Sequence, residues 1–109
     1  MNTASTDQAR GGARLEPGND GLYRIVGDLG LESAAALLGA GEAAFAGQPS
    51  IEVDLSGVTD ADSAGLAVLI EWTRSARRGG RSIVFSGMTP RLAAIARIGG
   101  VGGLLPTTR

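Results

Sequence analysis

The sequence predicts a single α/β domain in which helices pack against a mixed β-sheet. In one segment, Ile51, Val53 and Leu55 alternate with acidic residues, which is the period of a strand with one buried face. An apolar run over residues 64–70 begins directly after a serine, as a capped helix does. Strand-like and helix-like segments alternate in this way along 109 residues, which is enough chain for one core and too short for two.

The first part of the chain is predicted to be a tail followed by a hairpin. Residues 1–12 are small and polar, so we expect a disordered tail and a domain that covers residues 13–109. Residues 13–17 suit a short edge strand. The turn-forming sequence Asn19-Asp20-Gly21 joins this strand to a second strand over residues 22–27.

A first helix is expected over residues 33–46, which are rich in alanine and leucine. Ser33 is the expected N-cap of this helix. Gly39 and Gly41 weaken the prediction, because glycine lowers helix stability.

The central strand and the second helix are joined by a polar connection. The strand over residues 51–55 is expected to stop at Ser56-Gly57. The second helix is expected over residues 63–78, with Asp62 or Ser63 as its N-cap.

The last third of the chain completes the alternation. A break at Gly79-Gly80 precedes a strand over residues 82–85. A last helix is expected over residues 90–98, because Pro90 suits a first turn and Gly99-Gly100 suits a helix end.

Composition excludes several classes of function. The chain has no Cys and no His, which removes disulfide bonds, metal ligation by these residues, a Cys nucleophile and a His general base. All ten basic residues are Arg, so no Lys is present to meet a nucleotide in a phosphate-binding loop. The net charge of −1 gives no attraction toward nucleic acid. We therefore expect a protein that is not an enzyme, with no cofactor and no nucleic-acid partner.

Neither a metal site nor a membrane-spanning segment is expected. Asp54, Asp60 and Asp62 lack the spacing of a calcium-binding loop. The longest apolar run, residues 64–70, is far shorter than the ~20 residues that cross a bilayer. The N-terminus has no apolar core region typical of a secretory signal. We expect a cytoplasmic protein that reaches a membrane only through a partner.

Ser63 is the main candidate functional residue. At a helix N-terminus, backbone N–H groups and the helix dipole favour an anion. The position therefore suits a phosphoryl group on Ser63, or a carboxylate or phosphate brought by a partner. The alternative is that this serine, or Asp62 before it, only caps the helix, as such residues commonly do.

A helical wheel of ~100° per residue divides the helix after Ser63 into two sides. The core side is expected to hold Leu66, Leu69, Ile70, Thr73 and Ala76, and the exposed row Ser63, Ala67, Glu71, Arg74 and Arg78.

Several side chains on this helix carry further expectations. Glu71 and Arg74 are spaced to pair at i,i+3. Ala64 and Val68 are expected to lie beside the exposed row and Trp72 at its border, which would make an apolar surface ringed with charges, as docking surfaces are. The alternative is that Trp72 belongs to the core.

The short basic cluster Arg77, Arg78 and Arg81 follows at the end of the same helix. It is expected from the helix dipole and is not assigned a ligand.

Two motifs in the centre of the chain resemble the signature of the STAS domain. These are Asp54-Leu55-Ser56 at the end of a strand and Asp62-Ser63-Ala64-Gly65-Leu66 at the start of a helix. STAS domains occur in anti-sigma-factor antagonists and in sulphate transporters. The resemblance implies a STAS-like fold, and it places Ser63 at the serine that is phosphorylated in the antagonists.

The second half of the chain narrows the resemblance. The segments concerned are Leu66–Trp72, Ala76–Arg81, Pro90–Leu92, Gly100-Val101 and Leu104-Leu105. Together they look like MlaB-type STAS domains, which serve as the STAS subunit of the phospholipid-transporting ABC complex of Gram-negative bacteria. The resemblance implies a non-catalytic adaptor on the inner face of the inner membrane, which binds the ATPase subunit and stabilises or regulates it in maintaining outer-membrane lipid asymmetry.

Three functions of different class follow. The first is the adaptor, and the second is an anti-sigma-factor antagonist that a partner kinase switches by phosphorylating Ser63. The third, an enzyme with Ser63 as nucleophile, lacks a base to activate the serine. Both leading functions need a partner-binding surface, and the predicted residues are Asp62, Ser63, Ala64, Ala67, Val68, Glu71, Arg74 and Arg91.

Overall fold

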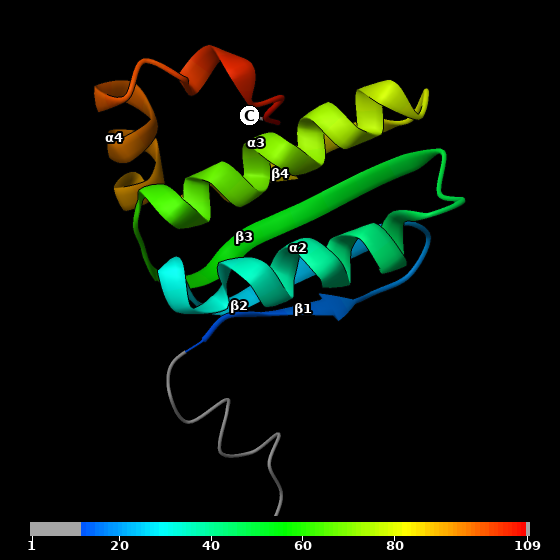
Figure 1. The fold of residues 1–109 in the computed structure, drawn as a ribbon, viewed down its shortest axis with the longest axis horizontal. Helices are drawn as coiled ribbons and strands as arrows, with labels where there is room; N and C mark the ends of the chain where they lie inside the picture. Colours follow the sequence, from blue (N-terminus) through cyan, green and yellow to red (C-terminus); the bar gives the residue numbers. More distant parts are fainter. Residues whose placement is uncertain (1–11, 109) are drawn as a thin grey trace, which may run out of the picture.

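The computed structural model describes residues 12–108 of the chain. The tail predicted over residues 1–12 lies outside this range, apart from its last residue. The elements, in chain order, are β1 (Arg14–Pro17), β2 (Leu22–Leu29), α2 (Leu31–Phe45), β3 (Ser50–Ala61), α3 (Ser63–Arg78), β4 (Ser82–Ser86), α4 (Pro90–Ile98) and a 3-10 helix, η1 (Gly102–Leu104). Figure 1 shows this arrangement as a ribbon.

The four strands form one mixed sheet in the order β1-β2-β3-β4. β1 is antiparallel to β2, whereas β2 with β3 and β3 with β4 are parallel pairs. Helices α2 and α3 lie side by side on one face of this sheet (Figure 1). The predicted fold, an α/β domain with helices packed on a mixed sheet, is confirmed.

The core fills the space between the sheet and the helices that cover it. Val53 in β3 pairs with Tyr23 in β2 and with Phe85 in β4, and all three side chains are buried. The next residues along two of these strands, Arg24 and Glu52, are exposed on the opposite face. The period-two alternation therefore reports a sheet with one covered face.

β3 is longer than predicted, because it continues through Ser56-Gly57 to Ala61. Val58 and Ala61 are buried, with 7% and 3% of their surface exposed. The strand pairing shifts register twice, so that β3 carries one extra residue at each shift relative to β2. These irregularities change the spacing of buried residues from two to three, and the alternation that marks a strand disappears from the sequence.

α2 begins at Leu31, two residues before the predicted start. The N-cap is Gly30, and Ser33 lies in the first turn. The Ser33 hydroxyl accepts a hydrogen bond from the Gly30 N–H (3.2 Å) and donates one to the Asp28 carbonyl (3.0 Å). The prediction of Ser33 as N-cap was wrong, because the N-cap is Gly30. The Ser33 side chain nevertheless accepts a hydrogen bond from a backbone N–H at the start of the helix.

Trp72 of α3 packs against Gly41 of α2 in the core. Trp72 is 1% exposed, and its ring meets Phe45 edge to face at 5.1 Å between centroids. A Cβ atom on Gly41 would overlap the indole ring. The glycine that weakens the helix in the sequence therefore makes the recess that receives Trp72. The expectation of Trp72 at the border of a docking surface was wrong, and the core alternative holds.

Candidate functional site

Asp62 caps α3 with its carboxylate. Its Oδ1 accepts hydrogen bonds from the N–H groups of Ala64 (2.9 Å) and Gly65 (3.1 Å). Of the two predicted caps, Asp62 is therefore the N-cap, and Ser63 is the first residue of the helix. These bonds satisfy donors that have no partner within the helix.

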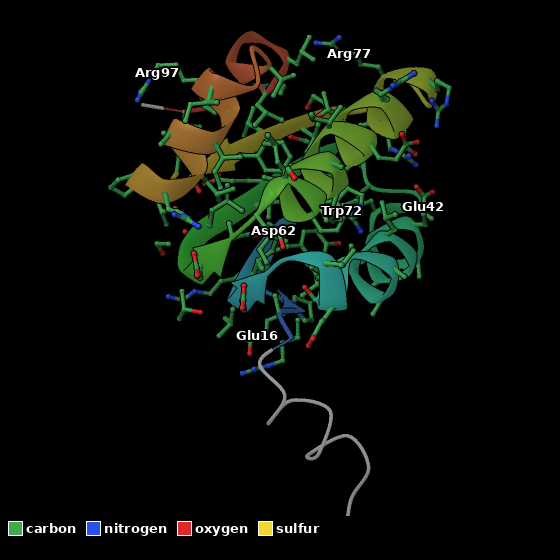
Figure 2. The ribbon with its side chains drawn as sticks, turned by 60° about the vertical axis from the view of Figure 1, so that its left-hand side comes forward. Glu16, Glu42, Asp62, Trp72, Arg77 and Arg97 are labelled. Atoms are coloured by element: carbon green, nitrogen blue, oxygen red, sulfur yellow. The ribbon has the colours of Figure 1, made fainter. Side chains whose placement is uncertain are left out.

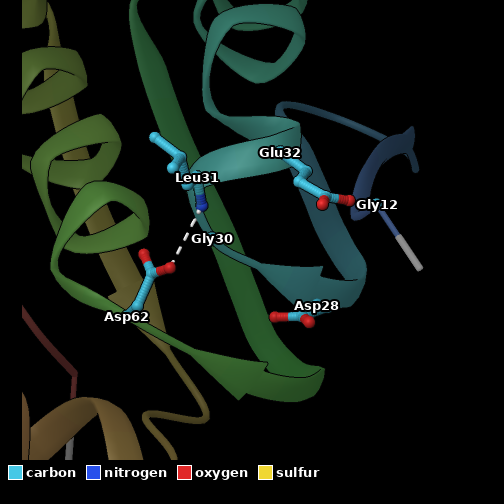
Figure 3. Close-up of a pocket in the computed structure, with 6 residues that line it drawn as sticks. All are labelled: Gly12, Asp28, Gly30, Leu31, Glu32 and Asp62. Carbon is cyan, nitrogen blue, oxygen red and sulfur yellow. Dashed lines mark hydrogen bonds between the residues drawn. The ribbon is translucent and has the colours of Figure 1, made fainter. Parts of the chain in front are cut away.

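The same carboxylate also binds α2. Asp62 Oδ2 accepts a hydrogen bond from the N–H of Leu31 (3.2 Å), the first residue of that helix (Figure 3). One side chain thus joins the N-termini of two neighbouring helices. The hydrogen bond from the Gly65 N–H is the largest influence on the Asp62 carboxyl and, with those from Leu31 and Ala64, holds its pKa below the ordinary value.

Ser63 is exposed, and within residues 12–108 its hydroxyl makes no hydrogen bond. The helix start was predicted to favour an anion. The anion at this position is the Asp62 carboxylate, which already accepts hydrogen bonds from two N–H groups of the first turn. A phosphoryl group on Ser63 would lie next to this carboxylate, so it would add repulsion at the helix start as well as charge.

Glycines allow the close approach of backbone and side chains at this site. A Cβ atom on Gly65 would overlap the carbonyl group of Leu29, at the end of β2. A Cβ atom on Gly30 would lie 2.9 Å from Asp62 Oδ2. The glycine of the Asp-Ser-Ala-Gly-Leu motif is therefore required by packing of α3 on β2.

Arg91, at the start of α4, is brought to the same end of the domain. Its Nε lies 3.2 Å from Asp60 Oδ1 and donates a hydrogen bond to the Ala61 carbonyl (3.3 Å). Thr89 caps α4 by accepting from the Leu92 N–H (3.2 Å). The structure therefore brings Arg91 to the two residues that precede Asp62, although they lie far apart in the sequence.

The exposed row of α3 agrees in part with the helical wheel. Ser63, Ala67 and Arg74 are exposed, and Ala64 is half-buried. Val68 is 1% exposed, so its assignment to the partner surface was wrong. The cause is α2, which packs beside α3 and covers a second side of it, whereas the wheel allowed for the sheet alone.

The charged part of the row pairs differently from the prediction. Half-buried Glu71 forms an ion pair with Arg78, at 3.3 Å. Within residues 12–108, Glu71 forms no ion pair with Arg74, the partner predicted from the sequence. Arg81 turns back on the end of α3, where its guanidinium donates to the Ser75 carbonyl at 3.5 Å. Two of the three residues in the predicted basic cluster, Arg78 and Arg81, thus have structural partners.

The contribution of α2 to this site was not predicted from the sequence. Leu31, beside Asp62, is 75% exposed, an unusual exposure for a large apolar side chain. It lines a cavity of about 260 Å³ together with Asp28, Glu32 and Asp62 (Figure 3). The start of α2 was predicted two residues too late, which left Leu31 outside the helix.

The other half of the signature has a structural role. Asp54 Oδ1 accepts a hydrogen bond from the Ser56 N–H (2.9 Å), which holds the pKa of the Asp54 carboxyl below its ordinary value. Arg24 lies 3.8 Å from the same carboxylate. Gly87 approaches so closely that a Cβ atom there would lie 2.7 Å from Asp54 Oδ1. Asp54 therefore holds the local backbone of β3, and its carboxylate leaves no room for a side chain at position 87.

Within residues 12–108, no group of three or more acidic residues is arranged to hold a metal ion. None of the helices in this range has the length and apolar content that crossing a bilayer requires.

Comparisons with known proteins agree with this geometry. A family model described as "Mlab, STAS domain" matches residues 14–106. The anti-sigma factor antagonist SpoIIAA in its unphosphorylated form has a TM-score of 0.66 at 16% identity, covering 89% of this chain and 88% of that chain. A sulfate transporter family protein from Wolinella succinogenes has a TM-score of 0.66 at 22% identity, covering 84% of this chain and 75% of that chain.

A third structure, an anti-sigma factor antagonist from Mycobacterium paratuberculosis, has a TM-score of 0.67 at 20% identity and covers 87% of this chain and 82% of that chain. At these identities the similarity establishes the fold alone. No curated protein sequence matches the chain significantly. Because the family model spans β1 to the residues after η1, which is most of the chain, the chain belongs to the MlaB-type STAS domain family.

Proposed function

We propose that this domain is a non-catalytic adaptor that binds the ATPase subunit of an ABC-type phospholipid transport complex, which maintains outer-membrane lipid asymmetry. The adaptor stabilises that subunit or regulates its ATP hydrolysis. It acts in the cytoplasm, at the inner face of the inner membrane, through its partner. The family match supports this proposal, because the matching model is that of MlaB-type domains.

The single observation that carries a binding function is the surface at the N-termini of α2 and α3, which we call the Ser63 surface. It comprises the exposed side chains of Leu31, Ser63 and Ala67, with half-buried Ala64 between them in sequence. Small residues let a partner approach the helix closely, and a 75% exposed leucine supplies apolar area to bury.

Charge makes this surface sensitive to modification. Asp28, Glu32 and Asp62 lie around it, and Arg91 is the basic residue held at the same end by Asp60. A further negative charge on Ser63 would lie beside carboxylates of the same domain, and burying it against a partner would cost desolvation energy that weakens binding. Arg74, exposed one turn beyond Glu71, is available to pair with an acidic residue of the partner.

The second candidate function is an anti-sigma-factor antagonist that a partner kinase switches at Ser63. The specific observation in its favour is the Ser63 hydroxyl, which is exposed and makes no hydrogen bond within residues 12–108. SpoIIAA has a similar fold in both its unphosphorylated and its phosphorylated form, so this fold accommodates the modification in that protein.

An affinity pull-down of the tagged chain from its native cytoplasm and solubilised membranes tests both functions. Mass spectrometry identifies the partners and the state of Ser63. Recovery of an ABC ATPase with unmodified Ser63 supports the adaptor, whereas recovery of a serine kinase together with phosphorylated Ser63 overturns it in favour of the antagonist.

Two variants connect the partner to the surface. Ala67→Glu should lose the partner, because it places a charge in the middle of the Ser63 surface. Ala40→Glu is the matched control, since Ala40 is an exposed alanine further along α2. If both variants retain the partner, the Ser63 surface is not the docking site.

A further inference from the structure

The exposed side of α2 is unusually apolar for a surface helix. Of the fifteen residues of α2, only Glu32 and Glu42 are charged. A surface helix normally turns charged and polar side chains to water, whereas a helix that is apolar on all sides is covered on all sides. The exposed residues of α2 are Leu31, Glu32, Ala35, Ala36, Gly39, Ala40, Glu42 and Ala43. α2 therefore has the composition of a helix that a further element covers.

The large apolar side chains on this helix surface fall into one row. Leu31, Ala35, Leu38 and Glu42 lie within about 60° of one another around the helix, at ~100° per residue. Leu31 is 75% exposed and Leu38 is half-buried. The alternating steps of four and three residues between these positions are those of a seam along which two helices pack. We call these four residues the α2 row.

The α2 row continues the Ser63 surface, because Leu31 belongs to both. Figure 3 shows the Leu31 side chain directed to the side of α2 that faces α3. Figure 2 labels Glu42 at the far end of α2 from Asp62. Glu42 lies about 16 Å along the helix from Leu31, at ~1.5 Å per residue. An element that covers the whole row therefore needs about three turns of helix.

The α2 row and the cavity beside it carry acidic charges only. Asp28, Glu32 and Asp62 line the cavity together with Leu31. Glu42 lies at the other end of the row, and α2 contains no arginine. Within residues 12–108, neither Glu32 nor Glu42 lies within 4.0 Å of an arginine side-chain nitrogen. A ligand that carries basic groups at both ends of the row would therefore complement it.

The same charges argue against two other occupants. A second copy of the chain would bring acidic residues together, because antiparallel rows place Glu42 beside the acidic cavity of the other copy and parallel rows place the two Glu42 residues side by side. An anionic lipid surface would be repelled, since the row has no basic residue to meet a phosphate. A basic helix meets neither obstacle, and the spacing of the seam favours a helix over an extended segment.

We propose that the α2 row binds an amphipathic, basic helix of a protein partner. Apolar residues of that helix cover Leu31 and Leu38, and the small side chain of Ala35 lets it approach closely. Its basic residues pair with Glu42 and with the carboxylates beside Leu31. This contact rests on the proposed function, because the same partner occupies the Ser63 surface, and it specifies the chemistry that the partner presents.

Photo-crosslinking from the row identifies the occupant. The full chain carries p-benzoylphenylalanine in place of Ala35 and is irradiated in its native cells, and the linked peptide is sequenced by mass spectrometry. We expect a peptide from a helix of another protein, with Arg or Lys within one turn of the linked residue. The matched control carries the same photoreactive residue in place of Ala40, which is exposed about 170° around α2 from the centre of the row. The control should give no such peptide.

Calorimetry with the purified cross-linked protein measures the contribution of each group. Ala35→Glu should weaken binding by roughly fivefold or more, whereas Ala40→Glu should bind like the wild type. Glu42→Arg should weaken binding by a similar factor, and added salt should weaken the wild type. Glu52→Arg is the matched control, because Glu52 is an exposed glutamate on the opposite face of the sheet. All four altered side chains are exposed, so circular dichroism and thermal unfolding should show an unchanged fold.

Cross-linking from position 35 to a second copy of this chain, to a peptide without basic residues, or to no protein overturns the proposal. Full binding by Ala35→Glu or by Glu42→Arg also overturns it.

The α2 row and the adaptor function fail separately. Loss of the partner in Ala67→Glu together with full binding by Ala35→Glu removes the α2 row and leaves the Ser63 surface. Cross-linking to a basic helix of a protein other than an ABC ATPase supports the α2 row and overturns the adaptor.

Discussion

Replacing Asp62 with alanine should destabilise the domain more than any other single change of an exposed carboxylate within residues 12–108. The change removes the acceptor of three backbone N–H groups, those of Ala64, Gly65 and Leu31. Loss of an N-cap aspartate costs about 1 kcal/mol. Loss of the hydrogen bond to the Leu31 N–H of α2 adds about 0.5–1 kcal/mol. This value is in the lower part of the range for hydrogen bonds, because Asp62 is exposed.

The free energy of unfolding should therefore fall by roughly 2 kcal/mol, which corresponds to a drop in Tm of about 10 °C for a domain of this size. Urea unfolding followed by circular dichroism measures the first quantity, and thermal unfolding the second. Asp60→Ala is the matched control. Asp60 is also exposed but pairs with Arg91 at the surface, so its loss should cost less than about 0.5 kcal/mol.

The pH dependence gives a second measure of the same interaction. The pKa of Asp62 is lower in the folded chain than its ordinary value of 3.8, so the carboxylate stabilises the fold fully above that pH. The stabilisation is lost as pH falls below 3.8 through the folded pKa. The difference between wild type and Asp62→Asn should therefore shrink in acid. Equal losses for Asp62→Ala and Asp60→Ala, or a difference that does not change with pH, would refute this account of the cap.

Three further predictions concern the core and the surface of α3. Gly41→Ala should lower the free energy of unfolding by about 1–3 kcal/mol in urea titrations, because the added Cβ overlaps Trp72. Gly39→Ala should raise it by about 0.5–1 kcal/mol, because nothing lies within 4 Å of that position. Equal changes in the two variants would contradict the packing of Trp72 on Gly41. Ser63→Asp should weaken partner binding in calorimetry with an unchanged Tm, and Ser63→Ala should preserve it; equal losses would argue against a charge-sensitive surface. Val68→Glu should abolish cooperative unfolding, while Ala67→Glu should fold and fail only in the pull-down; a folded Val68→Glu protein would show that this helix face is not core.

The regular parts of the fold were predictable from the sequence, because each shows its own period. α3 and α4 begin and end as predicted, since Gly79 and Pro90 mark their boundaries locally. β3 was predicted at less than half its length, because its pairing irregularities hide the alternation beyond Leu55. Register shifts depend on the neighbouring strand, so a single segment carries no sign of them.

The candidate site was predictable where it lies on one element. Asp62 and Ser63 were placed correctly at the start of α3, because capping is a local pattern. Burial of Val68 was not foreseen, and burial of Trp72 was left as an alternative, since both depend on which side of α3 faces α2. The exposed Leu31 was missed for a different reason, because a helix start capped by glycine leaves no side-chain signal in the sequence.

The hydrogen bonds of Asp62 and the close packing of Gly65 divide the signature motif into two kinds of position. Asp62 and Gly65 hold the helices and strands together, so their side chains are needed whether or not a partner exists. The Ser63 hydroxyl makes no hydrogen bond within residues 12–108. We therefore expect this chain to keep its fold when the serine is exchanged. In this chain the motif positions of Asp62 and Gly65 are accounted for by the architecture alone, whereas the presence of a serine at position 63 is not.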